Sequence, residues 1–188
     1  MVVHIAYGKQ GLPVTLPDDI PVRIIEPTYV PPVKDPVGTV LSSLRNPIGT
    51  RPLQELVKPT DSVGIVFSDI TRPTPNHILI PAILQELELA GVPRSRITLF
   101  NSTGTHRLNT EEELRSMLGE KIVGTYRIVQ NDARAEDQHE VVGKTRRGTT
   151  VMIHREFLRC SFKILTGFIE PHFFAGFSGG GKAVVPGM

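Results

Sequence analysis

The chain has 188 residues, 21 Lys and Arg against 19 Asp and Glu, and a formal net charge of +2. This length predicts one domain spanning residues 1–188, and a hydrophobic content of 39% excludes an intrinsically disordered chain. The nearly neutral charge gives no basic stripe that would neutralise many phosphates. We therefore expect no nucleic-acid partner.

The sequence has the features of a cytoplasmic protein. Its apolar stretches are shorter than the roughly 18 residues of a membrane span, and residues 1–10 lack the charged-then-apolar layout of a signal peptide. The single cysteine, Cys160, excludes an internal disulfide and fits a reducing compartment. We expect a cytoplasmic location and no membrane partner.

The first third of the chain is rich in proline and predicts extended structure. Residues 2–7 and 12–16 predict two short strands about a turn, and residues 22–25 predict a third strand. Asp35 followed by Pro36 has the composition of a helix start, which predicts a helix to about Arg45.

From Asp61 onward the pattern alternates between strand and helix. Thr110 and Glu113 form a capping-box pattern that opens one of the helices. Strands are predicted at residues 62–67, 97–100, 122–129, 150–154 and 162–166, and helices at 76–90 and from 110 to about 118. This alternation predicts an α/β fold with a Rossmann-like, mostly parallel sheet and helices on both faces, preceded by an N-terminal β-rich segment.

In such folds, ligands bind beyond the carboxyl ends of the strands. The segments that follow three of the predicted strands are residues 68–73, 101–107 and 168–172. In the first of them, Asp69 and Arg72 stand three residues apart. The guanidinium of Arg72 offers a planar fork for a carboxylate or phosphate. An internal Asp69–Arg72 ion pair that orders the loop is an equally good interpretation.

His106 and His172 lie in two of these segments. An imidazole can act as a general base near neutral pH, and two of them on opposite sides of a substrate would suit an isomerase. The alternative is that each is an ordinary surface histidine. Sequence spacing does not show that the two side chains face one another.

A glycine-rich loop, residues 176–182, ends in Lys182. Exposed backbone N–H groups beside a lysine predict a phosphate-bearing ligand. A P-loop needs Ser or Thr after the lysine, and Ala183 stands there instead, which counts against an NTPase. The loop leaves two alternatives open: covalent attachment of a cofactor at Lys182, or a phosphate- or nucleotide-binding module without catalysis.

Taken together, residues 68–73 (SDITRP), 104–107 (GTHR) and 170–187 resemble the nickel-pincer lactate racemase family, whose members act on 2-hydroxy acids. The order and spacing match across nearly the whole chain. The most specific part is 170–187, because it combines a histidine, a glycine loop and a lysine in family order. The resemblance implies a small, lactate-like 2-hydroxy acid as the substrate.

The resemblance also implies roles for individual residues. His106 and His172 match the catalytic acid and base, and Arg72 and Asp69 match substrate-binding residues. Lys182 matches the lysine to which the nickel-pincer pyridinium mononucleotide is covalently attached. The residues implied to lie against this cofactor are Ser178, Gly179, Gly180 and Gly181.

The mechanism implied by the resemblance is a transient oxidation of the substrate. One histidine takes the hydroxyl proton while hydride passes from the substrate carbon to the pyridinium ring. Hydride then returns to either face of the planar 2-keto acid, so configuration is lost. Reprotonation by the opposite histidine completes the inversion.

The chain departs from the family in its length. Family members are more than twice as long, and their nickel-ligand histidine lies beyond the position of Met188, so no metal ligand is expected within these residues. We therefore expect an N-terminal fragment with little or no activity alone and without bound cofactor. The partner of its exposed surface would be the C-terminal domain of the same chain, and without it self-association is expected.

Overall fold

The computed structural model describes residues 1–26 and 28–188 and contains two compact units, Met1–Val33 and Lys34–Met188. In the first unit, β1 (Val2–Ile5) and β2 (Leu12–Thr15) form an antiparallel hairpin. This confirms the two predicted strands and the N-terminal β-rich segment. The strand predicted at 22–25 is wrong, because these residues find no pairing partner in the described part of the chain. The expectation of one domain over residues 1–188 stays a prediction.

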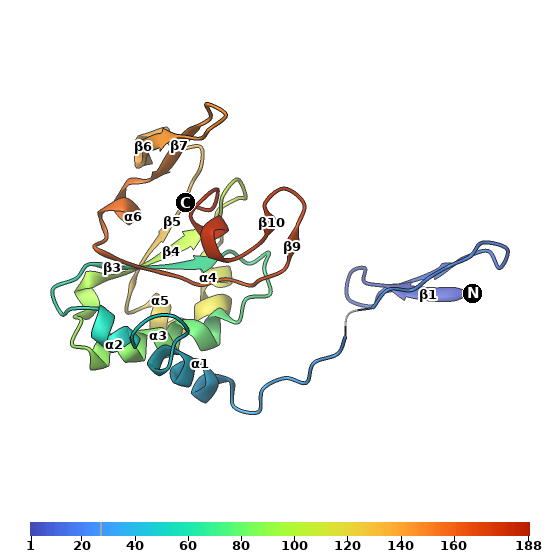
Figure 1. Cartoon of the computed structure of the whole chain (residues 1–188), viewed down its shortest axis with the longest axis horizontal. Helices are drawn as coiled ribbons and strands as arrows, with labels where there is room; N and C mark the ends of the chain where they lie inside the picture. Colours follow the sequence, from blue (N-terminus) through green and yellow to red (C-terminus); the bar gives the residue numbers. More distant parts are fainter. Residues whose placement is uncertain (27) are drawn as a thin grey trace. The chain divides into compact units, whose positions relative to one another are not determined.

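A four-stranded parallel sheet forms the centre of the second unit (Figure 1). Its strands are β3 (Val63–Ser68), β4 (Ile97–Ser102), β5 (Arg127–Gln130) and β8 (Phe162–Leu165), in the order β5-β4-β3-β8. The chain moves outward from β3 to β5 and then returns to the opposite side of β3. This topology confirms the α/β fold with a Rossmann-like parallel sheet.

Five helices cover one face of the sheet (Figure 1). They are α1 (Pro36–Arg45), α2 (Leu53–Leu56), α3 (Asn76–Leu89), α4 (Glu111–Leu118) and α5 (Glu120–Val123). Asp35 caps α1 by accepting from the Gly38 N–H at 2.9 Å, and Thr110 and Glu113 form the predicted capping box of α4. Residues 122–129 were expected to form one strand, which is wrong: α5 and a turn occupy the first half, and only β5 pairs with β4.

The fully buried Glu86 joins three of these helices. Its carboxylate accepts from Arg45 of α1 at 2.7 Å and from Gln54 of α2 at 2.7 Å. These charged contacts hold the pKa of Glu86 below its usual range, Arg45 contributing most and burial opposing it. A buried carboxylate is tolerated here because its oxygens are paired.

The other face carries a hairpin of β6 (His139–Lys144) and β7 (Thr150–His154), followed by α6 (Arg155–Arg159). The sequence predicted β7 but not its partner β6, whose residues are mostly exposed and lack an apolar pattern. A second core of Val66, Phe100, Ile153 and Phe157 lies between this layer and the sheet. Helices therefore lie on both faces, as predicted.

The last segment folds back over the carboxyl ends of the strands. It contains a short hairpin of β9 (Pro171–His172) and β10 (Gly176–Phe177), then one 3₁₀ turn, η3 (Gly180–Ala183). Two further 3₁₀ turns, η1 (Arg94–Arg96) and η2 (Glu136–Gln138), precede β4 and β6. Across residues 1–26 and 28–188, the helices are too short or too polar to span a membrane.

Candidate functional site

A cavity of about 560 Å³ lies at the carboxyl ends of the parallel strands. Its walls come from the segments after β3, β4 and β8, where the topology of an open α/β sheet places a ligand site. Seven of the residues singled out from the sequence line this one cavity: Asp69, Arg72, His106, His172, Ser178, Gly179 and Lys182. The fold thus brings together side chains from three loops that are far apart in the sequence.

Asp69, directly after β3, is only 3% exposed. Thr71 folds back onto its carboxylate: the Thr71 hydroxyl donates to Oδ1 at 2.6 Å and the Thr71 N–H donates to the same oxygen at 3.2 Å. This is the local turn that aspartate side chains form with residues that follow them. The second carboxylate oxygen, Oδ2, is left to face the loop after β4.

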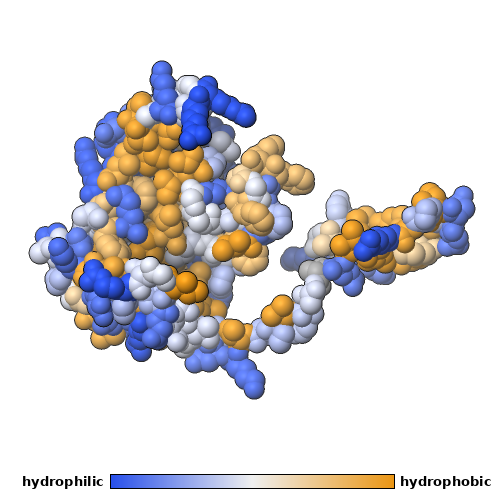
Figure 2. All heavy atoms as spheres, in the orientation of Figure 1, coloured by the Kyte–Doolittle hydropathy of each residue, from blue (hydrophilic) through white to orange (hydrophobic). Residues whose placement is uncertain are grey.

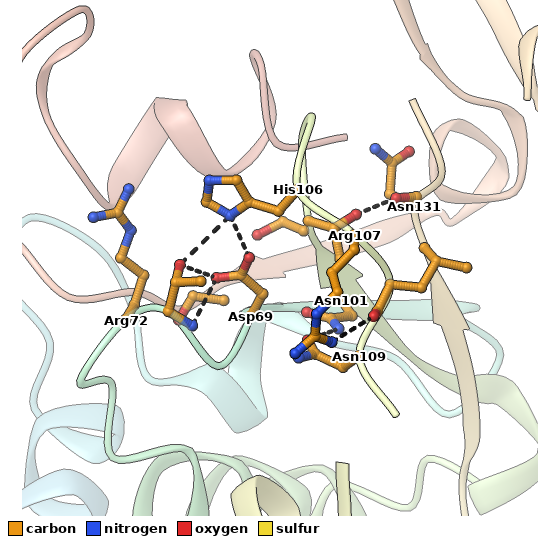
Figure 3. Close-up of polar contacts among 12 residues, drawn as sticks. Asp69, Arg72, Asn101, His106, Arg107, Asn109 and Asn131 are labelled. Carbon is orange, nitrogen blue, oxygen red and sulfur yellow. Dashed lines mark hydrogen bonds and ion pairs between the residues drawn. The ribbon is translucent and has the colours of Figure 1, made fainter. Parts of the chain in front are cut away.

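His106 sits on that second oxygen, as Figure 3 shows. Its Nδ1 lies 2.5 Å from Oδ2 of Asp69 and 3.5 Å from the Thr71 hydroxyl. Because a carboxylate only accepts hydrogen bonds, Nδ1 carries the proton. In the neutral ring Nε2 then has the free lone pair, so the orientation suits His106 to act as a base.

The loop that carries His106 is held in place by β5 and the residue after it. Figure 3 labels Asn109 of this loop and Asn131, the residue after β5. Thr103 donates its hydroxyl to the Asn131 carbonyl, and its own carbonyl accepts from the His106 N–H at 3.0 Å. At the other end of the loop, the side-chain amide of Gln130 makes two hydrogen bonds to the backbone of Asn109. It accepts from the Asn109 N–H at 2.7 Å and donates to the Asn109 carbonyl at 2.9 Å. The backbone of His106 is therefore fixed independently of Asp69.

Arg72 does not pair with Asp69, so the interpretation of an internal Asp69–Arg72 ion pair is wrong. Its Nη1 donates to Oε1 of Glu170 at 3.1 Å, and the two side chains are 24% and 31% exposed. Asp69 is instead paired with His106. The guanidinium lines the cavity, where it can also meet an anion.

His172 is held in the opposite way to His106. Its Nδ1 accepts from the backbone N–H groups of Phe174 and Ala175, each at 3.2 Å. The proton of the neutral ring therefore lies on Nε2, which can donate a hydrogen bond. Partial desolvation, followed by the charges of Lys182 and Arg72, lowers the pKa of His172 from its ordinary value.

Lys182 lies in η3, at the wall between the main cavity and a second one of about 430 Å³. Burial lowers the pKa of its amine, and the nearby charge of Arg72 lowers it further. More of the amine is then neutral and nucleophilic than in an exposed lysine. This is the chemistry that covalent attachment of a cofactor requires.

The glycine loop divides between the two cavities. Gly179 lines both, whereas Gly180 and Gly181 line only the second. Gly179 has a φ of +73°, and a Cβ added to Gly167 would lie 2.9 Å from its Cα. The two backbones are therefore too close for a side chain at 167, whereas a Cβ added to Gly180 or Gly181 would meet nothing within 4 Å. The one turn of η3 is too short to supply the helix N-terminus of a P-loop.

Ser178 is 5% exposed, and its hydroxyl is engaged within the chain. It donates to the Phe168 carbonyl and accepts from the Glu170 N–H at 3.1 Å, while the Ser178 N–H donates to the Glu170 carbonyl at 2.9 Å. Ser178 thus fixes the base of the β9–β10 hairpin. One lone pair of its oxygen remains for a ligand.

The sequence did not assign roles to Thr71 and Glu170. The Asp-x-Thr spacing of 69 and 71 is a local signal for the turn onto Asp69. Glu170 precedes Pro171 and His172, but its pairing with Arg72 joins positions 98 apart, which no local pattern reveals. Among residues 1–26 and 28–188, no three His, Cys, Asp or Glu side chains form a metal-binding group. The expected nickel ligand beyond Met188 stays a prediction.

Comparison with solved structures identifies similar folds. The lactate racemase apoprotein from Thermoanaerobacterium thermosaccharolyticum superposes with a TM-score of 0.86 at 33% identity, covering 100% of this chain and 44% of that one. A crystal structure of a Thermotoga maritima protein has a TM-score of 0.59 at 24% identity, covering 81% and 37%, and supports the fold alone.

Comparison of sequences identifies the family. A lactate racemase from T. thermosaccharolyticum is 34% identical over 189 residues, which cover 99% of this chain and 44% of that protein. One from Lactiplantibacillus plantarum is 41% identical over 150 residues, 80% of this chain and 35% of that protein. The chain thus spans less than half the length of these relatives. Residues 7–188 match the lactate racemase N-terminal domain, and the chain belongs to that family.

Proposed function

We propose that this chain provides the acid and base residues of a racemase or epimerase that acts on a small 2-hydroxy acid such as lactate. The observation that carries the proposal is the complementary protonation of two histidines at one cavity. Nδ1 of His106 faces a carboxylate, and Nδ1 of His172 faces two backbone N–H groups. In the neutral rings one Nε2 therefore accepts a hydrogen bond while the other donates one, so the two histidines meet a substrate oxygen in different ways.

The proposed proton transfers use these two Nε2 atoms. Nε2 of His106 takes the hydroxyl proton of the substrate, and Asp69 stabilises the imidazolium that forms. His172 acts as the acid after it has taken a second proton from water on Nδ1, which must first leave the Phe174 and Ala175 N–H groups. Its Nε2 then gives a proton to the oxygen on the opposite side and leaves a neutral ring, and the roles reverse for the other enantiomer. Arg72 binds the substrate carboxylate through its guanidinium. Asp69, expected as a substrate-binding residue, acts in this proposal through His106 as a positioning residue.

The residues around Lys182 fit a tethered cofactor of the kind the family resemblance implies. The Lys182 amine has a lowered pKa, and a Cβ added to Gly180 or Gly181 would meet nothing within 4 Å, which leaves space beside the lysine for a bound group. We propose that Lys182 holds a nickel-pincer mononucleotide covalently, with Ser178 and the glycines at 179–181 beside it. When bound, this group supplies the hydride acceptor that racemisation through a 2-keto acid needs.

The test uses the whole protein, purified from cells that make the cofactor. Racemisation is followed as D-lactate formed from L-lactate, and the mass of the Lys182 peptide and the nickel content are measured in the same sample. His106→Asn and His172→Asn are each expected to lower kcat by about 10²–10⁴-fold, with the mass addition on Lys182 retained. A Glu140→Gln variant, altered on the exposed β6 strand, is the control and keeps its activity.

Two results would count against the proposal. Unchanged turnover in both histidine variants would overturn the acid and base roles. An unmodified Lys182 without nickel would overturn the tethered cofactor and favour a phosphate-binding module built on the glycine loop. For residues 1–188 alone, we expect little or no racemisation, because the His106 side chain is 46% exposed and water is not excluded from the site.

A further inference from the structure

The ion pair between Arg72 and Glu170 stands out because it places a carboxylate of the protein on the side chain that would bind a substrate carboxylate. Nη1 of Arg72 donates to Oε1 of Glu170 at 3.1 Å, with both side chains largely shielded from solvent. The contact uses one of the five N–H donors of a guanidinium. The remaining fork can face a second acceptor in the cavity.

Glu170 is held at this position by its own backbone. Its N–H donates to the Ser178 hydroxyl and its carbonyl accepts from the Ser178 N–H at 2.9 Å. Ser178 is buried, and its hydroxyl also donates to the Phe168 carbonyl. The backbone of Glu170 is therefore fixed beside Arg72, and the pair is less exposed to solvent than a surface ion pair.

The charges around the cavity are nearly balanced. Asp69, which accepts hydrogen bonds from His106 and Thr71, and Glu170 carry the negative charges, and Arg72 and Lys182 carry the positive ones. The charge of Glu170 also opposes the lowering of the His172 pKa by those two cations. Removing the charge of Glu170 would make the cavity more positive and leave Arg72 free to bind an anion fully.

We propose that Glu170 is a positioning and specificity-determining residue: it holds Arg72 at the cavity and competes with a ligand carboxylate for the guanidinium. The proposal deepens the proposed function and rests on it, because Arg72 is taken there to bind the substrate. A ligand carboxylate must share Arg72 with Glu170, which weakens its binding and favours release of a carboxylate product. A neutral ligand of the same shape does not meet this competition.

The test compares L-lactate with lactamide, which has the same shape but no charge. Dissociation constants are measured by NMR titration of the whole protein and of its Glu170→Gln variant, which keeps an oxygen for Nη1 and removes the charge. We expect Glu170→Gln to bind lactate about two- to fivefold more tightly and lactamide equally. In an Arg72→Gln background, Glu170→Gln should change lactate binding by less than this.

Equal or weaker lactate binding by Glu170→Gln would overturn the competition. A similar gain for lactamide, or the same gain without Arg72, would overturn the role of the pair in specificity. If no variant binds lactate, the carboxylate site of the proposed function fails and the competition fails with it. The positioning role is then decided by the NMR signal of the Arg72 guanidinium. It should be sharp in the unchanged chain and broadened in Glu170→Ala, and identical signals would overturn it.

Discussion

His106 and His172 line the same cavity but are anchored by different partners. His106 contacts the buried carboxylate of Asp69, and the two ends of its loop bond to β5 and to the residue that follows β5. His172 belongs to a hairpin of two-residue strands, and its ring accepts only from the backbone N–H groups of Phe174 and Ala175. One side of the site is fixed by side chains in a packed sheet, and the other by a short local turn.

The difference extends to the surroundings of the two rings. The segment around His172 exposes large apolar side chains: Phe173 and Phe174 are essentially fully exposed, at 103% and 96%. Figure 2 shows this hairpin as a light orange projection from the main body. Apolar side chains are left uncovered in this way at surfaces that meet another protein segment. Within the described residues, the His106 loop is therefore anchored on both sides, whereas the apolar side chains next to His172 lack cover.

The largest expected effect comes from removing the carboxylate under His106. Asp69→Asn should lower racemisation by the whole protein about 10²–10⁴-fold, because the amide can turn an N–H toward Nδ1 and force the wrong tautomer. D-lactate formation from L-lactate measures it. Glu156→Gln, which alters an exposed pair with Arg127 on the far face of the sheet, serves as the control. Full activity of Asp69→Asn would show that the Asp69 carboxylate does not set the tautomer of His106.

A smaller effect is expected where Gly179 of the glycine loop approaches Gly167, just after β8. In Gly167→Ala the new methyl group would lie 2.9 Å from the Gly179 Cα, so the backbone must shift at a cost of about 1–3 kcal/mol. Urea unfolding of the chain measures this. Gly181→Ala is the matched control, since its Cβ would meet nothing within 4 Å, and should change stability by less than about 0.5 kcal/mol. Equal stability of the two variants would show that Gly167 and Gly179 are not tightly packed against each other.

The smallest expected effect is a shift in the titration of His172. Partial desolvation and the charges of Lys182 and Arg72 lower its pKa, so the ring should still be neutral at a pH near 6.5. NMR titration of the ring protons should give a midpoint below this value. Lys182→Met should move the midpoint upward, because it removes one of the two cations. If the His172 midpoint is the same in Lys182→Met as in the unchanged chain, the Lys182 amine lies farther from His172 than the structure places it.

Local signals in the sequence predicted the parts of the molecule that local chemistry determines. Asp35 and Thr110 were identified as helix caps because their side chains bond to N–H groups three residues on. The site residues could be located because loops at the carboxyl ends of parallel strands meet at one edge. Pairings between distant segments could not be predicted: the Arg72–Glu170 pair joins positions 98 apart.

The errors have physical causes as well. Residues 22–25 contain three β-branched residues, but no described strand pairs with them, and strand formation depends on pairing as well as propensity. Strand β6 was missed because most of its side chains are exposed, so no apolar alternation marks it. A bulge between Val141 and Gly143 disturbs its register further.

The position of β8 in the sheet bears on how the molecule acquires its shape. Val63 of β3 pairs with Phe162 of β8 in parallel register, whereas the helices and the β3–β4 unit are built from segments closer in sequence. Bringing Phe162 next to Val63 costs chain entropy before any contact between the two strands compensates for it, and contacts between distant segments slow folding. The segment that bears His172 and Lys182 follows β8 directly. The cavity is therefore complete only once β8 has paired with β3, and the attachment proposed at Lys182 would follow that pairing.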